Sequence, residues 1–278
     1  MSSTNIKQIL SKKIPKSKLE LVGRSFDIVG SIAIVDVKPE LKKYQKDIAR
    51  AIMQMHKTVT TVLAKASAVN EKFRTRKLRF ILGERTKETI YKENNCIMKV
   101  DVEKVYFSPR FVNERKSLAE LVKPNENVLV YFAGVGPYAL VIAKKEKTAK
   151  VVGIELNPIG VKYFEENIRL NKLTNVIAIK GDVKRQAKKY ANWADRIIMP
   201  HPSASEKFLD SAFIAAKNEC VVHFYTFIKD EDYSQIEKKI ESSAKKNNCK
   251  AEIINRIVAR PYAKDTFQAC VEFQISKK

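Results

Sequence analysis

The sequence predicts an α/β protein in which a smaller α+β domain precedes a doubly wound, mostly parallel sheet of seven strands. Strand-like and helix-like segments alternate from about Val105 onward, a pattern typical of parallel strands joined by crossover helices. The last two strand-like segments have no helix between them, which indicates an antiparallel pair at one edge of the sheet. Residues 1–104 mix helices and strands without that regular alternation.

The smaller domain is expected to span residues 1–104. Its first segment places Ile6, Leu10 and Ile14 on one side, as in an amphipathic helix. An alternating, β-branched segment with Gly30 at its centre predicts a hairpin. The later segments predict a helix at residues 40–57 and strands at residues 58–67, 79–84 and 96–108, and the run at 73–76 is also expected as a strand.

The larger domain is expected to span residues 105–278. A helix at 113–122 opens it and ends at a segment rich in Pro and Asn. The expected strands lie at residues 128–132, 150–156, 175–181, 194–200, 219–227, 249–261 and 266–276. The expected helices between them lie at residues 138–146, 158–172, 205–218 and 232–247.

Charge is the strongest global signal. The chain carries 53 Lys and Arg against 31 Asp and Glu, a formal net charge of +22, and both halves are basic. Such an excess favours a polyanionic partner, and nucleic acid above others. A solvated, lysine-rich surface without such a partner is the alternative.

Other classes of protein are disfavoured. No apolar run approaches the roughly 20 residues that cross a bilayer, and the start of the chain lacks the apolar core of a signal peptide. We therefore expect a cytoplasmic protein with no membrane partner. The four Cys have no C-x-x-C spacing and the three His are dispersed, so no metal site is expected. We also expect a monomer.

A glycine loop carries the first chemical signal. The apolar run at 128–131 meets Gly134 and Gly136, without the third glycine of a dinucleotide fingerprint. Glu155 ends the next strand, where a carboxylate can accept both hydroxyls of a ribose, as found in NAD and S-adenosylmethionine. Asp182 ends the strand after that and could reach an adenine amino group. The alternative is that both acids only cap helices.

These three elements, in this order, resemble the class I S-adenosylmethionine-dependent methyltransferases. The resemblance implies a Rossmann-like domain that binds S-adenosylmethionine. This chain departs from the family pattern at Tyr131, where many members have an acidic residue. Cofactor binding is therefore expected to depend more on the loop backbone and Glu155. The implied cofactor-binding residues are Tyr106, Phe132, Gly134, Gly136, Glu155, Leu156, Asp182 and Val183.

A closer resemblance begins with the segment KVYFSPRFVNERKSLAELV at residues 104–122. Together with FAGVGPY, IELNP, ENIRLNK and ADRIIMP further on, it resembles the archaeal and eukaryotic tRNA (guanine-37 N1)-methyltransferases and their wyosine-pathway relatives. The match covers about residues 72–227. It implies that the substrate is tRNA, contacted at its anticodon arm, and that the smaller domain binds RNA.

The resemblance also implies roles for single residues. Glu114 matches the general base that removes the N1 proton of guanine, since N1 is a poor nucleophile until it loses that proton. Arg74 matches the arginine that stabilises the charge growing on O6, and Arg76 takes that role if the alignment shifts by two residues. Tyr106 and Arg115 belong to the same catalytic site. The implied substrate-binding residues are Arg76, Arg110, Pro200, His201 and Pro202.

Two features depart from the guanine-37 enzymes. Their Asn-Leu-Pro loop is replaced here by Pro200, His201 and Pro202, so a tricyclic wyosine precursor as acceptor, or aminocarboxypropyl transfer, is an open alternative. A non-catalytic RNA-binding protein with a degenerate methyltransferase fold is another. Full-length members also carry a small extra N-terminal domain, for which the residues before Phe26 leave no room, so recognition is expected to rest on the anticodon arm.

Overall fold

The computed structural model describes residues 5–23 and 26–277, which form two compact units. The first unit comprises the residues up to Glu93 together with Ile97–Phe111. The second comprises Asn94–Cys96 and the residues from Val112 onward. The sequence placed a single boundary between residues 104 and 105, whereas the main crossing from unit to unit lies between Phe111 and Val112.

The first unit is an α+β fold built on a four-stranded sheet with the order β1-β2-β3-β4. The predicted hairpin forms around Gly30, and β2 then runs parallel to β3, with a helix in the crossover between them. The predicted face of the first helix is confirmed, because Ile6, Leu10 and Ile14 are buried. The elements are α1 (Ile6–Leu10), α2 (Lys16–Leu19), β1 (Asp27–Val29), β2 (Ile32–Val35), a 3-10 turn (Pro39–Tyr44), α3 (Gln45–Met55), β3 (Thr61–Lys65) and β4 (Leu78–Gly83).

Two elements of this unit differ from the expectation. A two-stranded hairpin pairs β5 (Glu88–Glu93) with β6 (Cys96–Asp101), and β5 was not expected. The run at 73–76 is not a strand but part of the loop before β4. Arg74 there has a φ of 53°, a left-handed backbone conformation that lies outside the range of regular strands.

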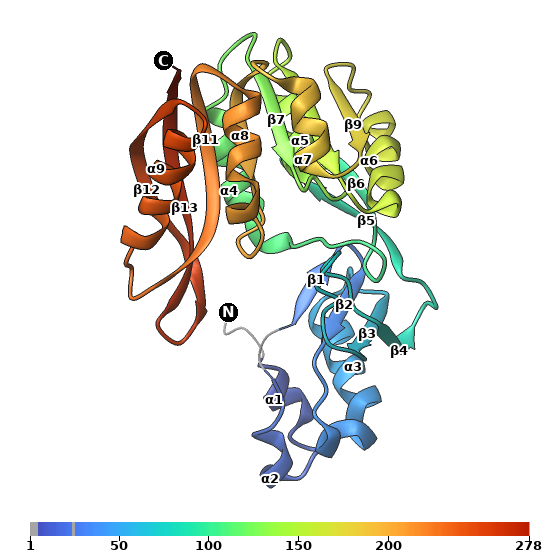
Figure 1. Ribbon diagram of the computed structural model, residues 1–278. Helices are drawn as coiled ribbons and strands as arrows, with labels where there is room; N and C mark the ends of the chain where they lie inside the picture. Colours follow the sequence, from blue (N-terminus) through green and yellow to red (C-terminus); the bar gives the residue numbers. More distant parts are fainter. Residues whose placement is uncertain (1–4, 24–25, 278) are drawn as a thin grey trace. The chain divides into compact units, whose positions relative to one another are not determined.

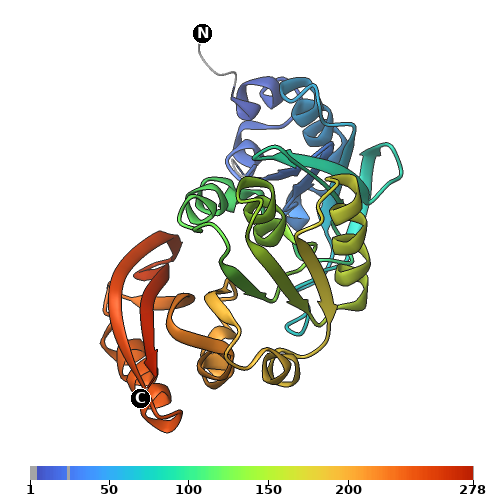
Figure 2. The ribbon, with the colours of Figure 1, turned by 90° about the horizontal axis from the view of Figure 1, so that it is seen from above.

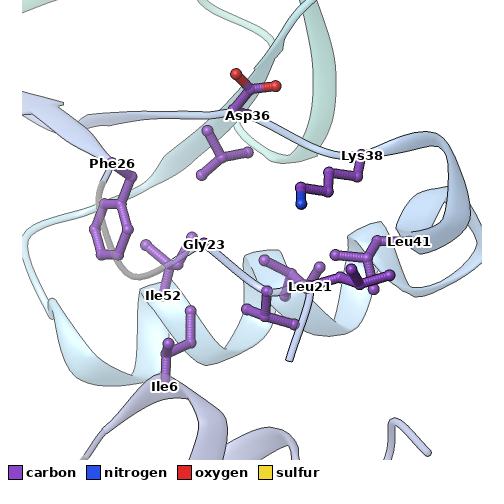
Figure 3. Close-up of a pocket in the computed structure, with 11 residues that line it drawn as sticks. Ile6, Leu21, Gly23, Phe26, Asp36, Lys38, Leu41 and Ile52 are labelled. Atoms are coloured by element: carbon purple, nitrogen blue, oxygen red, sulfur yellow. The ribbon is translucent and has the colours of Figure 1, made fainter. Parts of the chain in front are cut away.

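An apolar pocket of about 180 Å³ lies in the first unit beside α1 and α3 (Figure 3). Ile6, Leu41 and Ile52 are among the aliphatic side chains that line it, and Asp36 and Lys38 are its charged residues. The predicted cofactor residues Gly134, Glu155 and Asp182 belong to the second unit, so this pocket of the first unit is not the predicted cofactor site.

The second unit contains the predicted seven-stranded sheet, with the order β12-β13-β11-β10-β7-β8-β9. The pairs from β11 to β9 are parallel, and β13 is antiparallel to both β11 and β12. The expected antiparallel pair is therefore confirmed, and it forms the orange-to-red end of the sheet in Figure 1. The strands are β7 (Asn127–Tyr131), β8 (Lys150–Glu155), β9 (Val176–Lys180), β10 (Ala194–Met199), β11 (Ala216–Lys229), β12 (Cys249–Ala263) and β13 (Thr266–Lys277).

Helices cover both faces of this sheet (Figure 2). Alternate strand residues such as Leu129, Ile197 and Val222 form one core with α7, α8 and α9, because successive side chains of a strand point to opposite faces. On the opposite face, the ring of Phe164 in α6 packs against the backbone of β8. The short helix α7 was not expected. The helices are α4 (Val112–Glu120), α5 (Pro137–Lys145), α6 (Pro158–Leu170), α7 (Val183–Ala187), α8 (Leu209–Ala215) and α9 (Ser234–Lys246).

Candidate active site

The glycine loop follows β7 directly and has an unusual backbone. Phe132, Gly134 and Gly136 all have positive φ values, of 52°, 58° and 90°. Gly136 is the residue before α5, and Pro137 opens that helix. A Cβ atom on Gly136 would lie 2.1 Å from the Phe164 ring. The loop therefore packs its backbone directly against α6, which only glycine permits at this position.

The variant Gly136→Ala tests this packing. It is expected to lower the free energy of unfolding by about 2–4 kcal/mol, since it combines a disfavoured φ with overpacking against a buried ring. Thermal unfolding measures the loss. Gly23→Ala is the matched control, because nothing lies within 4 Å of its added Cβ. Equal unfolding temperatures for the two variants would contradict the account.

Glu155, at the end of β8, holds the glycine loop in place. Its Oε2 accepts a hydrogen bond of 2.7 Å from the Gly134 backbone N–H, and its Oε1 accepts one of 2.6 Å from the Asn157 N–H. Burial raises the pKa of this carboxyl, and the backbone hydrogen bonds oppose that shift. The Leu156 N–H also bonds this carboxyl, and because a carboxylate has about four acceptor positions, it can still accept a hydrogen bond from a ribose hydroxyl.

Two asparagines that the sequence analysis did not single out stabilise the same region. The Asn157 side chain accepts a hydrogen bond of 3.0 Å from the Ile159 N–H and caps α6. The buried Asn167 Nδ2 donates to the carbonyl of Val135 in the glycine loop, at 3.1 Å. The Asn-Pro pair at the start of α6 is a recognisable cap signal, whereas nothing in the local sequence connects Asn167 with a loop 32 residues earlier.

The remaining predicted cofactor residues differ in which of their groups are available to a ligand. Asp182 caps α7 by accepting a hydrogen bond of 2.9 Å from the Lys184 N–H, which is the helix-capping role named as its alternative. The Val183 side chain is buried in the core, so only its backbone could face a ligand. Leu156 is 41% exposed and offers an apolar surface next to Glu155.

Tyr131 is part of the core. Its side chain is fully buried, and its hydroxyl donates a hydrogen bond of 2.9 Å to the carbonyl of Ser211. The residue that replaces the acidic one of many methyltransferases is therefore held by α8.

Glu114 lies in the first turn of α4 and is half-buried. Burial raises the pKa of its carboxyl, while a hydrogen bond with Tyr225 and the charges of Arg115 and Arg260 lower it. The cost of burial is the largest of these effects, so the pKa of the carboxyl is raised overall.

Arg115 and Tyr138 extend this group into the core. The Arg115 guanidinium lies 5.8 Å from the centre of the Tyr138 ring, and both side chains are buried. Tyr138 and Tyr225 pack against each other with ring centres 6.3 Å apart, and burial raises the pKa of both hydroxyls. Arg115 is thus a buried member of the group around Glu114, together with two tyrosines from α5 and β11.

The loop after β10 contains Pro200, His201 and Pro202. The His201 ring lies 5.2 Å from the Phe132 ring, and Phe132 also contacts Phe208 at 5.0 Å. Pro202 is buried and Pro200 is half-buried. The structure therefore brings His201 to the residue that begins the glycine loop, although the two are far apart in the sequence.

The other predicted site residues belong to the first unit. The Arg74 guanidinium lies 4.4 Å from the centre of the Tyr106 ring, a distance typical of a cation–π contact. Arg110 forms hydrogen bonds of 2.8 Å and 2.7 Å with Asp27. Arg76 is half-buried in the loop before β4. Arg74 and Tyr106 are therefore brought together, and Arg110 is engaged by a carboxylate.

Among the described residues, His223, Cys270 and Glu272 form a group of metal-ligand type, with ligand atoms within 4.8 Å of one another. Both ring nitrogens of His223 are engaged, Nε2 with Arg196 at 2.7 Å and Nδ1 with Glu272 at 2.9 Å. Burial lowers the pKa of the imidazole, and the hydrogen bond with His223 lowers that of Glu272. These contacts form a buried hydrogen-bonded network and leave no imidazole nitrogen for a metal.

No helix among the described residues is long and apolar enough to cross a membrane.

Comparison with family models gives two matches. Residues 89–253 match the TRM5/TYW2 methyltransferase domain. Residues 6–86 match the TYW2 N-terminal domain.

Individual proteins agree with these matches. The chain is 39% identical to the tRNA (guanine(37)-N(1))-methyltransferase Trm5b of Pyrococcus abyssi, over 95% of this chain and 78% of that protein. The crystal structure of that organism's Trm5b gives a TM-score of 0.87, covering 98% of this chain and 81% of the other. The chain is also 30% identical to the tRNA(Phe) (4-demethylwyosine(37)-C(7)) aminocarboxypropyltransferase of Pyrococcus horikoshii, over 98% of this chain and 96% of that protein. The structure of P. horikoshii TYW2 in complex with MeSAdo matches with a TM-score of 0.81 and 28% identity, covering 98% of both chains.

Proposed function

Because the chain belongs to the TRM5/TYW2 methyltransferase family, whose members bind S-adenosylmethionine and modify guanine-37 of tRNA, we propose that it transfers a methyl group to N1 of that guanine. The observation that carries this proposal is Glu114, a half-buried carboxylate with a raised pKa in the same unit as the glycine loop. It is supported by the similarity to Trm5b over nearly the whole chain.

The proposed mechanism assigns proton transfer to Glu114. Its carboxylate accepts the N1 proton, and a raised pKa makes it a stronger base than an ordinary glutamate. Tyr225 orients the carboxylate through its hydrogen bond. S-adenosylmethionine supplies, when bound, a methyl group made electrophilic by its sulfonium. Arg74 stabilises the negative charge on O6, and its contact with the Tyr106 ring restricts the guanidinium.

Binding is assigned to the remaining predicted residues. Glu155 and the loop at Gly134 and Gly136 hold the ribose and the methionine part of the cofactor, and Leu156 packs against the adenine. His201, seated on Phe132, takes the position of the missing loop asparagine and contacts the guanine. We further propose that the anticodon arm of tRNA is the partner, which agrees with the net charge of +22.

Replacing Tyr225 by phenylalanine tests the protonation of Glu114. The hydrogen bond stabilises the carboxylate, so its loss raises the pKa of Glu114 further. Because the base must be ionised, the acid limb of the kcat/KM profile is expected to move to higher pH. Tyr233→Phe, at the start of α9, is the control and is expected to leave the limb in place. Superimposable profiles for Tyr225→Phe and the unaltered protein would refute the assignment.

Aminocarboxypropyl transfer to a tricyclic precursor at the same nucleotide is a second candidate. It is favoured by the match of residues 6–86 to the TYW2 N-terminal domain and by the loop at Pro200 and His201. S-adenosylmethionine labelled either in its methyl group or in its carboxyl group separates the two reactions. We expect only the methyl label to enter tRNA-Phe. Entry of the carboxyl label would replace the proposed function by the second candidate.

A further inference from the structure

One face of the antiparallel end of the sheet carries a row of side chains. The row starts at Tyr225, which is hydrogen-bonded to Glu114 of α4. Phe227 of β11 pairs with Gln268 of β13, and Gln268 pairs with Arg260 of β12. Residues paired directly across strands point to the same face. Tyr225, two residues before Phe227, shares that face and contacts Glu114 through its hydroxyl.

The guanidinium in this row is held in position. Arg260 Nε donates a hydrogen bond of 3.0 Å to Oε1 of Gln268, whose side chain is almost completely buried. The charge of Arg260 also acts on the carboxyl of Glu114 and lowers its pKa. Arg260 therefore places a positive charge on the same strand face as Tyr225, the residue that is hydrogen-bonded to the proposed base, within one unit of the chain.

The row ends in an exposed aromatic side chain. Tyr262 is 58% exposed, and its ring centre lies 4.4 Å from that of Phe227 at an interplanar angle of 41°. One side of the Tyr262 ring is thus supported by Phe227 while much of its surface faces solvent. Exposed aromatic rings beside arginines are how proteins bind single-stranded nucleic acid, because a base stacks on the ring and the guanidinium attracts the phosphate.

We propose that Phe227, Arg260 and Tyr262 form a binding site for an unpaired nucleotide of the substrate RNA, next to the nucleotide that enters at Glu114. The base stacks on Tyr262, and Arg260 contacts the backbone phosphate. This inference rests on the proposed function for the identity of the RNA, an anticodon loop. We assign RNA as the ligand because the site combines an exposed aromatic ring with a guanidinium, and the chain has a net charge of +22.

The test compares Arg260→Ala and Tyr262→Ala with Arg256→Ala. Arg256 lies on the same strand, but it pairs with Val271 and forms a salt bridge with Glu237 of α9, so it faces the opposite side of the sheet. The readout is the Kd for a fluorescent anticodon stem-loop RNA without cofactor. The two row variants, Arg260→Ala and Tyr262→Ala, are each expected to raise Kd by about tenfold. Arg256→Ala is expected to raise it by less than about twofold.

A second readout separates a role in the site from a structural one. Loss of Arg260 removes a charge that favours the Glu114 carboxylate, so Arg260→Ala is also expected to move the acid limb of kcat/KM to higher pH. Row variants that bind RNA as tightly as Arg256→Ala would overturn the proposal. A change in oligomeric state for Tyr262→Ala without a change in RNA affinity would instead identify a subunit interface and also overturn it.

The binding assay needs no turnover, so the two proposals can fail separately. If the unaltered protein binds the stem-loop and the row variants weaken that binding, the site stands even when no methyl group is transferred. If methyl transfer occurs and the row variants bind the stem-loop as tightly as the unaltered protein, only the proposed nucleotide-binding site is refuted. A protein that does not bind the stem-loop at all would overturn both.

Discussion

Replacing Glu114 by glutamine is expected to lower kcat by about 100-fold or more, the usual contribution of a positioned general base. Glutamine keeps the shape and the hydrogen-bonding reach of the side chain but cannot accept the N1 proton. Cofactor affinity is expected to be unchanged, because the carboxylate that holds the glycine loop is Glu155.

Single-turnover methylation of tRNA, with calorimetric titration of the cofactor, measures both quantities. Glu120→Gln is the matched control, since Glu120 is exposed at the other end of α4. If Glu114→Gln keeps its rate within about threefold of the unaltered protein, far below the contribution of a general base, Glu114 is not the base.

Replacing Glu155 by alanine is expected to weaken S-adenosylmethionine binding by more than a hundredfold. Two hydrogen bonds to a charged acceptor contribute about 3 kcal/mol or more, which corresponds to that factor in Kd. The variant also removes the acceptor that fixes the Gly134 and Asn157 backbone N–H groups, so the loop loses its support at the same time.

Calorimetric titration with S-adenosylhomocysteine measures this loss, and Glu165→Ala, exposed on α6, is the control. Equal affinity for Glu155→Ala and the control would remove Glu155 from the cofactor site. An unaltered protein without measurable affinity would favour the non-catalytic RNA-binding alternative, since such a scaffold needs no cofactor.

Much of the larger unit could be predicted because its signals are local. Each parallel strand is a short apolar run, each crossover helix has helical spacing, and the glycine loop stands between a strand and a helix. The antiparallel end could be predicted because no helical segment separates the last two strand-like segments, which form β12 and β13. Short elements escaped prediction. The five residues of α7 and the alternating, strongly charged β5 have too few apolar positions to produce a clear period.

The contacts around Glu114 could not be predicted for a different reason. Tyr225, which is hydrogen-bonded to the carboxyl, and Arg260, whose charge acts on it, lie more than 100 residues further along the chain. Their strands come together only because β11, β13 and β12 pair in that order. The direction of the pKa shift depends on burial by these strands and by α5, which no local pattern encodes. The positive φ of Arg74 is likewise set by the loop before β4, since arginine itself has no preference for that conformation.

Nucleoside mass spectrometry of an unmodified tRNA-Phe transcript, after reaction with S-adenosylmethionine, tests the central claim most directly. A transcript with adenosine at position 37 is the control. We predict a single 1-methylguanosine at position 37 of the first transcript and no product on the second. An unmodified first transcript, with a product found only on tRNA that carries the tricyclic precursor, would contradict the claim and assign the protein to wyosine synthesis.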